Sequence, residues 1–302
     1  MGSDMRIGFA LPQFGAMADP GKVAGFARRI EEIGGDSLWV ADRLLSPVNP
    51  AVGYAGAATF PEAFQSILDP FVLLAIAASA TEHVRIGTNV LDGPWYPPAL
   101  LARALTSIDV LSGGRLTVGL GAGWSPEEFE AAGIPMGQRG ARLDECLEVL
   151  EVLWTSNPAE YHGRHWSVPA TQVRLRPVQR PRPPVFLAGF TPAAWRRVAR
   201  RADGWLPAWR PGMGEFQPAA AITEPLGRIR EIAEQNGRDP ASIATILRVY
   251  PIGTGTVAEV VDTLQRAGQE ADVTDALVDL MAISRSTGHA LELAEEILEA
   301  VR

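Results

Sequence analysis

Apolar runs of strand length alternate with segments of helical periodicity along this chain, from Met5 onward. Such alternation indicates parallel strands that are joined by helical crossovers. Eight strand and helix units fit into the 302 residues, which suits a TIM (β/α)8 barrel and exceeds what an open doubly wound sheet usually contains. We therefore predict an α/β fold of this type. Its strands are expected at residues 7–12, 37–41, 84–91, 115–123, 185–188, 204–207, 247–252 and 276–283.

Helical segments separate these strands, and we expect one domain over residues 5–302. Two stretches interrupt the rhythm. A loop rich in Gly, Ala and Pro extends from Arg43 to Leu68 and is typical of a lid or a binding loop. Residues 156–184 contain repeated prolines that keep the backbone extended, so we interpret them as an insertion, for which a hairpin is one form, rather than a domain boundary. Residues 1–4 resemble a remnant of cloning, with Met5 as the natural start. The helices are expected at residues 20–33, 70–81, 99–111, 139–154, 193–201, 217–236 and 257–267, with a last one from about residue 288.

Three glycines recur at every second residue of the fourth expected strand, at Gly119, Gly121 and Gly123. Because alternate residues of a strand share a face, the missing side chains clear one side of it, and something large is expected to lie there. Two other interpretations stay open. A dinucleotide-binding motif would place its glycines in a turn with different spacing, and glycines in a barrel strand can simply relieve crowding.

A helix start follows this strand directly. Ser125 is expected to cap a helix whose first residue is Pro126, and Glu128 lies three residues after Ser125, the spacing of a capping box. A bare strand would then run into a helix, with the cleared face opening beside the junction.

Composition excludes several classes of protein. A net charge of −8 and a pI near 5.2 argue against a nucleic-acid or membrane-surface partner. The single cysteine, Cys146, rules out an intrachain disulfide and lies among leucines as a small core residue would. The longest apolar run, residues 71–80, is about half of what a membrane span needs, and we recognise no secretion signal. We therefore expect a cytoplasmic protein.

Five segments together resemble one family, the luciferase-like monooxygenases, and within it the deazaflavin F420-dependent oxidoreductases of actinobacteria. The resemblance covers most of residues 5–209 in order. The segments are LWVADRL at 38–44, VRIGTNVL at 84–91, PPALLARALTSIDVLSGGRLTVGLGAGW at 97–124, QRGARLDECLEVLEVLW at 138–154 and PVFLAGFTP at 184–192.

The resemblance implies a homodimeric barrel with an insertion near the fifth strand. It implies an enzyme that transfers a hydride between F420 and a small organic substrate. F420 resembles a flavin in which carbon replaces the central N5. A cis peptide bond is implied between Asn89 and Val90, behind the tricyclic ring. The residues implied to flank the ring and its side chain are Gly121, Ala122, Gly123 and Trp124.

The same resemblance implies a phosphate-binding turn at Ala188, Gly189, Phe190 and Thr191, after the fifth strand. A physical argument supports this turn independently, because free N–H groups and the positive end of the dipole make a helix start an anion site. Pro192 would then occupy the first helical turn, where its missing donor does least harm.

The proton-transferring group is where this sequence departs from its relatives. Many F420 enzymes have Asp followed by His at the end of the second strand, whereas here Asp42 precedes Arg43. Arginine stays protonated in proteins, so it cannot serve as a general acid, although it could clamp an anionic substrate or stabilise an enolate. A second acidic position of some relatives is Trp124. Asp42 and Arg43 are therefore the catalytic candidates, and the alternative for Asp42 is to pair with Arg43 or to bind the deazaflavin.

Several other residues are weaker candidates. Residues 284–288 offer a second anion site after the last strand. No spacing of histidine, cysteine or acidic residues suggests a metal, so we predict none. The further loop candidates are Tyr54, Glu62, Tyr96 and Glu128, and the aromatic residues expected to wall an apolar substrate pocket are Trp95, Tyr96, Trp205 and Trp209.

Other functions remain open at this point. The nearest alternative keeps the fold but uses reduced FMN and oxygen as a monooxygenase. A second is a barrel that binds flavin or deazaflavin without turnover, which the missing histidine and acid suggest. A lyase or hydrolase without redox chemistry has no residue set to support it.

Overall fold

Parallel strands form the centre of the molecule. The computed structural model describes residues 5–252 and 254–302. The strands of its main sheet are β1 (Arg6–Ala10), β2 (Ser37–Val40), β3 (Arg85–Thr88), β4 (Leu91–Asp92), β5 (Leu116–Gly121), β8 (Val185–Ala188), β9 (Gly204–Leu206), β10 (Ala208–Trp209), β11 (Ala244–Thr245), β12 (Leu247–Val249) and β13 (Asp275–Val278). They follow the order β10-β12-β13-β1-β2-β3-β5-β8-β9-β11, with β4 paired to β5, and their described pairings are parallel, as predicted.

The sheet closes on itself. Its path ends in β10 and β11, yet β10 continues β9 after Pro207 and β12 continues β11 after Ile246. Backbone hydrogen bonds bridge both breaks, from Ile246 N to Trp205 O at 3.2 Å and from Arg248 N to Pro207 O at 2.9 Å. Eight strand positions therefore form a ring, and the predicted TIM barrel is confirmed.

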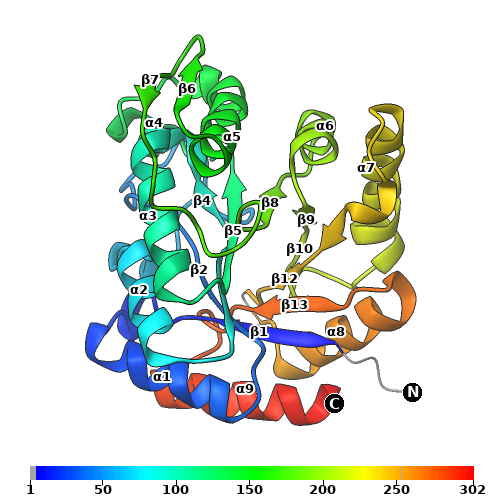
Figure 1. Cartoon of the computed structure of the whole chain (residues 1–302). Helices are drawn as coiled ribbons and strands as arrows, with labels where there is room; N and C mark the ends of the chain where they lie inside the picture. The colour runs from blue at the N-terminus through cyan, green and yellow to red at the C-terminus, as the bar shows by residue number, and fades with distance from the viewer. Residues whose placement is uncertain (1–4, 253) are drawn as a thin grey trace.

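Helices surround the strands (Figure 1). They are α1 (Pro20–Glu32), α2 (Pro70–Ala80), α3 (Pro98–Leu111), α4 (Pro126–Ala131), α5 (Arg139–Thr155), α6 (Pro192–Arg201), α7 (Glu224–Gln235), α8 (Val257–Ala271) and α9 (Thr287–Val301). The helix predicted over residues 217–236 instead begins as a π-helical segment (Ala219–Thr223) before α7. Within the described ranges, no helix has the length and apolar character that crossing a bilayer requires.

The predicted insertion contains a hairpin. Strands β6 (Ala159–His162) and β7 (Ser167–Thr171) pair antiparallel, and Figure 1 shows them beside α5, away from the main sheet. The hairpin form is thus confirmed. Cys146 on α5 is buried among apolar side chains, as expected for a core residue.

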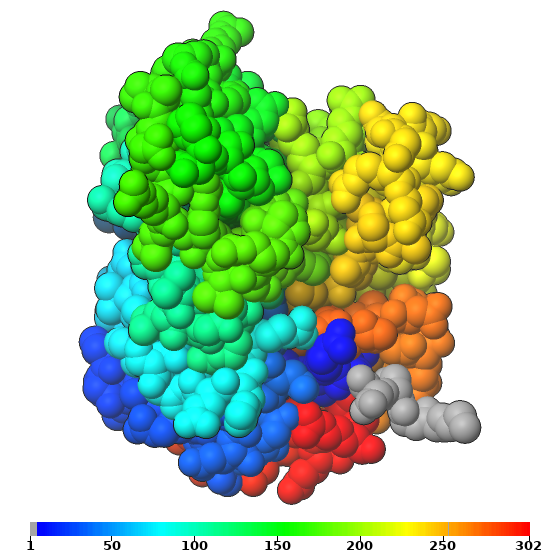
Figure 2. All heavy atoms as spheres, viewed as in Figure 1, coloured from blue at the N-terminus to red at the C-terminus, as the bar shows by residue number. Residues whose placement is uncertain are grey.

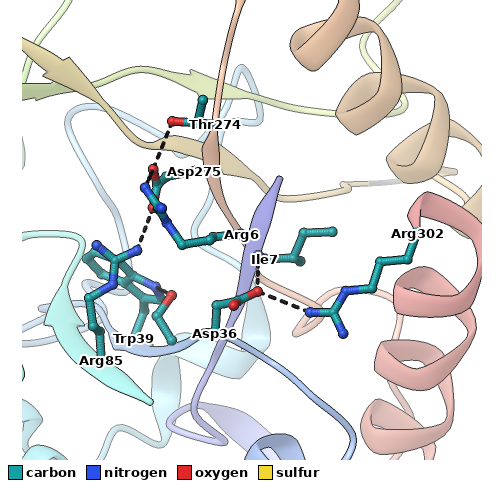
Figure 3. Close-up of polar contacts among 9 residues, drawn as sticks. Arg6, Ile7, Asp36, Trp39, Arg85, Thr274, Asp275 and Arg302 are labelled. Atoms are coloured by element: carbon teal, nitrogen blue, oxygen red, sulfur yellow. Dashed lines mark hydrogen bonds and ion pairs between the residues drawn. The ribbon is translucent and has the colours of Figure 1, made fainter. Parts of the chain in front are cut away.

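One end of the barrel is held by charged side chains. Asp275 on β13 accepts hydrogen bonds from Arg6 Nε at 2.8 Å and from Arg85 Nη2 at 2.5 Å, which links β1, β3 and β13 (Figure 3). Nearby, Asp36 accepts from Ile7 N at 2.8 Å. Burial alone would raise the pKa of Asp275, but the two guanidinium groups outweigh it and lower that pKa. These contacts lie at the amino ends of the strands, where a TIM barrel places residues for stability.

Strand β5 packs closely against the end of β3 and the residues that follow it. A Cβ atom on Gly119 would lie 1.9 Å from the Thr88 carbonyl oxygen, and one on Gly121 would lie 2.7 Å from Val90 Cγ2. The Thr88 hydroxyl also bonds to Gly119, accepting from its N–H at 2.8 Å and donating to its carbonyl oxygen at 2.7 Å. The large neighbour expected on the cleared face is therefore the protein's own chain.

Gly123 differs from the other two glycines. It lies beyond the end of β5 rather than within the strand, and its φ is +74°. A Cβ atom there would lie 2.7 Å from Phe129 Cε2 on α4. The expectation that all three glycines belong to the strand is therefore wrong at this position, and a bulky residue at Gly123 would strain the backbone.

The expected capping box on α4 does not form in the described structure. Ser125 donates to Glu127 Oε2 at 3.0 Å, and its hydroxyl accepts no hydrogen bond from the helix. Glu128 turns away and accepts from Leu44 N at 2.8 Å. The expectation is wrong because the Glu128 carboxylate is drawn to a distant arginine, Arg43, at 3.1 Å.

The close approach at Gly119 is testable. We expect Gly119→Ala to lower the free energy of unfolding by about 2–3 kcal/mol, because its Cβ must displace the Thr88 backbone. Urea unfolding measures the effect. The matched control is Gly227→Ala on α7, where nothing lies within 4 Å, and it should raise stability by up to about 1 kcal/mol. Wild-type stability in Gly119→Ala would contradict the packing of these two segments.

Candidate active site

Aromatic rings cover the carboxyl end of the barrel. The long loop after β2 folds back so that Tyr54, Phe60 and Phe64 pack around Trp124, which follows β5. Ring centroids are 5.2 Å apart for Phe60 and Trp124 and 6.0 Å apart for Tyr54 and Trp124. We call these four residues the aromatic cover. They are brought together from two loops that are more than 50 residues apart in the sequence.

Arg43 lies beneath the aromatic cover. Its side chain is only 7% exposed, and its guanidinium carbon lies 4.8 Å from the centroid of the Trp124 ring. Its Nη1 is 3.1 Å from Glu128 Oε2, and its Nη2 is 3.8 Å from Asp92 Oδ2. A cation stacked on rings and facing carboxylates is well stabilised, which explains how a guanidinium can be buried here.

Three carboxyl groups gather around Arg43, namely Asp42, Asp92 and Glu128, and we call them the carboxyl cluster. Asp42 Oδ2 accepts hydrogen bonds from Tyr96 Oη at 2.8 Å and from Asp92 N at 3.1 Å. Burial nevertheless raises the pKa of Asp42 to about 6. Burial raises the pKa of Asp92 well above its usual range, and the neighbouring Asp42 raises it further. Burial also raises the pKa of Glu128, against the effect of Arg43.

A cavity of about 110 Å³ opens between the carboxyl cluster and the opposite wall of the barrel. Arg248 forms that wall: its Nη2 binds Asp279 Oδ2 at 2.6 Å, and its Nη1 donates to the Asn89 carbonyl oxygen at 3.2 Å. The Asn89–Val90 peptide bond is cis, as the resemblance implies. The lining residues are Phe14, Ala41, Asp42, Arg43, Tyr54, Phe64, Asn89, Val90, Asp92, Trp124, Arg248, Asp279 and Met281.

Three buried donors at this cavity have no hydrogen-bond partner in the described parts of the chain. They are Asn89 Nδ2, Arg248 Nε and Arg43 Nη1, and the last of these lies 3.1 Å from Glu128 Oε2 in an ion pair. Leaving a buried donor unpaired costs about 1–3 kcal/mol, so such groups in a cavity wall are suited to a polar ligand.

A second cavity, of about 510 Å³, adjoins the first and shares Tyr54, Asp279 and Met281 with it. Its wall is mostly apolar. The remaining lining residues are Ala55, Ala57, Pro61, Ala63, Tyr250, Pro251, Ile252 and Ala282. A pocket of this size and character suits a small organic molecule.

The predicted phosphate turn lies at the start of α6. Thr191 caps the helix, its hydroxyl oxygen accepting from Ala194 N at 3.3 Å. Gly189 has a φ of +149°, and a Cβ there would lie 2.3 Å from Ala194 Cβ, so a glycine is needed. Phe190 is 60% exposed. Ala188 is half-buried and packs against the core beside Phe186.

The structure brings together five of the residues predicted for the site, at the 110 Å³ cavity: Asp42, Arg43, Asn89, Val90 and Trp124. Among the described residues that line it, the predicted Gly121, Ala122, Gly123, Ala188, Gly189, Phe190 and Thr191 are absent. The roles of both groups toward a cofactor stay predictions.

The structure also gives the positions of several residues that were named as weaker site candidates. Tyr54, Tyr96 and Glu128 belong to the mouth of the barrel, whereas Glu62 is exposed. Trp205 is fully buried in the core and donates to the Gly189 carbonyl oxygen at 3.0 Å, so it is no pocket wall. Around residues 284–288, Ser286 caps α9 by accepting from His289 N at 3.1 Å, which is the alternative role of that segment.

Sequence reasoning missed Asp92, Arg248 and Asp279. Asp92 directly follows a predicted strand, which is where barrel sites lie, whereas Arg248 and Asp279 fall within the strands predicted at residues 247–252 and 276–283. For Asp92 that position was the available signal, although it is shared by many residues with no role. Within residues 5–252 and 254–302, no group of three or more His, Cys, Asp or Glu side chains is arranged to hold a metal ion.

A larger hollow lies outside the barrel. It measures about 600 Å³ and is lined by residues of α5 and α6, where Figure 2 shows a depression between these parts of the surface. Two of its four lining arginines form ion pairs: Arg182 contacts Glu151 at 2.6 Å and Arg201 contacts Glu148 at 2.5 Å. The residues that line it in the described structure include none of the predicted site residues.

Known proteins resemble this chain along its length. The model of the luciferase-like monooxygenase family matches residues 5–300. An uncharacterized protein of Mycobacterium tuberculosis is 33% identical over 221 residues, which are 72% of this chain and 74% of that protein. An F420-dependent glucose-6-phosphate dehydrogenase of Amycolatopsis mediterranei is 30% identical over 210 residues, 67% of this chain and 57% of that enzyme. The crystal structure of the monooxygenase RslO1 from Streptomyces bottropensis aligns with a TM-score of 0.75 and 22% identity, over 98% of this chain and 99% of that one.

The raised pKa of Asp42 predicts how stability depends on pH. The folded state holds this proton more tightly than the unfolded state, so the stability it contributes is fully present below about pH 4 and is lost as the pH rises through about 6. We expect this group to lower the free energy of unfolding by up to about 3 kcal/mol across that window.

Urea unfolding at a series of pH values tests this expectation. Asp42→Asn should remove that part of the slope, since asparagine keeps an acceptor for Tyr96 but does not titrate. The control is Asp144→Asn on α5, whose side chain is 41% exposed, and it should keep the wild-type slope. A wild-type slope in Asp42→Asn would contradict the assignment.

Proposed function

This chain belongs to the luciferase-like monooxygenase family, and on that premise we propose that it is an oxidoreductase transferring a hydride between F420 and a small organic substrate. The name of the relative from Amycolatopsis mediterranei supports F420 as the cofactor. The observation that carries the proposal is the pair of unpartnered donors, Asn89 Nδ2 and Arg248 Nε, within the part of the mouth that the structure describes.

The donors of this mouth fit a deazaflavin ring. Such a ring carries carbonyl oxygens and ring nitrogens along one edge, and these accept hydrogen bonds of the kind that Asn89 and Arg248 can donate. The volume fits less well, because a cavity of about 110 Å³ is small beside the roughly 300 Å³ or more of typical ligand pockets. We infer that the aromatic cover moves outward when the ring enters.

When bound, F420 would supply a carbon that gives or accepts a hydride. The protein's part is to hold ring and substrate in contact and to exclude water. The aromatic cover is suited to excluding water, and the 510 Å³ cavity beside it is suited to an apolar substrate. Arg43 is already engaged by Glu128 and Asp92, so we assign it a positioning role in the carboxyl cluster rather than that of a substrate clamp.

The turn at α6 is suited to the phosphate of the cofactor's side chain. Thr191 accepts from Ala194 N, which leaves its hydroxyl hydrogen free to donate to an anion. The dipole of α6 adds to this attraction. The homodimer that the resemblance implies stays a prediction.

Binding of F420 and of FMN by the purified protein tests the proposed cofactor. We expect tight F420 binding with quenching of tryptophan fluorescence, because Trp124 lines the cavity, and weaker binding of FMN. Oxidation of reduced F420 by a panel of aldehydes and ketones would then establish turnover. Preference for FMN together with oxygen consumption would instead make the protein a flavin monooxygenase, and F420 binding without turnover would make it a binding protein.

The proposed phosphate turn can be tested by substituting two threonines that each cap a helix. Thr191→Ala removes a hydroxyl at the proposed phosphate, and we expect its dissociation constant for F420 to rise roughly tenfold, the value of one hydrogen bond to a charged group. Thr256→Ala is the control, because Thr256 caps α8 in the same way, accepting from Glu259 N at 3.3 Å. Equal effects of both substitutions on F420 binding would place the phosphate elsewhere.

A further inference from the structure

The sequence has no proton donor at the two positions where relatives of this kind carry one, Arg43 and Trp124. We propose that Asp92 supplies the proton that accompanies hydride transfer instead. This inference rests on the proposed function of the same site. It assigns a task to a residue in the cavity wall that lies three positions after Asn89 on the chain.

Position supports the assignment. Asp92 lines the cavity next to Asn89 and Val90, and its side chain is 7% exposed. Asp42 and Arg43 lie on one side of it. Proton transfer requires hydrogen-bond reach of the reacting atom, and Asp92 shares the cavity wall with the residues expected to contact the ring.

Charge balance determines which carboxyl group keeps a proton. Among the described side chains, Arg43 is the cation that contacts the carboxyl cluster, and three buried carboxylates cannot all ionise around one guanidinium. Glu128 accepts from two backbone N–H groups and lies closest to Arg43. Asp42 accepts from Tyr96 Oη and from the Asp92 N–H. Both are thereby stabilised as anions.

Asp92 receives less support as an anion. Its carboxyl group lies 3.8 Å from Arg43, and the nearby Gly123 N–H lowers its pKa only weakly, while the negative charges of Asp42 and Glu128 oppose its ionisation. Burial raises its pKa most, and Asp42 adds to the rise. Asp69 acts on Asp42 in the same direction at longer range. Two carboxyl groups whose environments push their pKa values apart are a recurring arrangement for an acid and its supporting anion.

Other groups near the cavity are less suited to donate. The hydroxyl of Tyr96 already donates to Asp42, and burial raises its pKa far above the working range. Burial raises the pKa of Tyr54 to about 12. Arg43 and Arg248 remain charged at every ordinary pH.

For a carbonyl substrate the step balances as follows. The carbonyl carbon gains a hydride from reduced F420 while the electron pair of the C=O π bond moves to oxygen. That oxygen takes the proton of Asp92 and becomes a hydroxyl group. Asp92 is left as a carboxylate, which Arg43 stabilises, and a proton from solvent restores it.

An infrared spectrum of the cofactor-free protein tests the protonation state directly. We expect the C=O band of a protonated carboxyl group at neutral pH in the wild type and its loss in Asp92→Asn, where asparagine still offers an acceptor to Gly123 N–H. The control Asp144→Asn should retain the band. A band that survives in Asp92→Asn, or that is missing from the wild type, would overturn the assignment.

Kinetics separates this inference from the proposed function. With reduced F420 and a carbonyl substrate, we expect Asp92→Asn to bind F420 as the wild type does but to turn over roughly 100-fold to 1,000-fold more slowly. In the wild type, kcat/KM should fall at high pH because Asp92 loses its proton, and this fall should be absent in Asp92→Asn. Wild-type turnover in Asp92→Asn would overturn the role of Asp92 alone, whereas a wild type that does not bind F420 would overturn the proposed function and this role together.

Discussion

The close approach of two neighbouring segments governs this site. Glycines at 119 and 121 let β5 lie directly against the chain between Thr88 and Asp92, which hydrogen bonds to Gly119 also hold in place. That contact aims Asn89, Val90 and Asp92 into the mouth of the barrel. The opposite end is tied by Asp275 and its two arginines, so stability and chemistry are placed at different ends of the same strands.

Arg43 stands where the resemblance to F420 enzymes implies a histidine, and its charge affects the electrostatics of the whole mouth. An arginine cannot give up its proton, so the charge it brings must be balanced by neighbours. Glu128 approaches within 3.1 Å, and the aromatic cover shields the pair from water. Arg43 is then the one described cation that contacts two further carboxyl groups, Asp42 and Asp92, and we propose that Asp92 therefore keeps its proton. In this account the acid lost at one position of the motif is recovered at another.

The sequence predicted the barrel, because strand and helix periodicity reflect burial. Five of the twelve residues it named for the site line one cavity, because short motifs keep their local geometry, and their catalytic and cofactor-binding roles stay predictions. It failed where partners come from distant parts of the chain. Ser125 and Glu128 have the spacing of a capping box, yet Glu128 is captured by Arg43, which lies 85 residues earlier. Asp92 was missed, because its position after a predicted strand is shared by many residues and nothing local shows that the segment after β3 turns its side chain inward. The cleared face was identified correctly at Gly119 and Gly121 but not at Gly123, and its occupants are Val90 and the Thr88 backbone.

A crystal structure of the protein with F420 bound tests the central claim most directly. We expect the tricyclic ring against Asn89 and Val90, with its edge accepting from Asn89 Nδ2 and Arg248 Nε, and the phosphate at Gly189–Thr191. The aromatic cover should have moved away from its position over Arg43. A ring bound in the hollow between α5 and α6, or a phosphate held away from α6, would contradict this account.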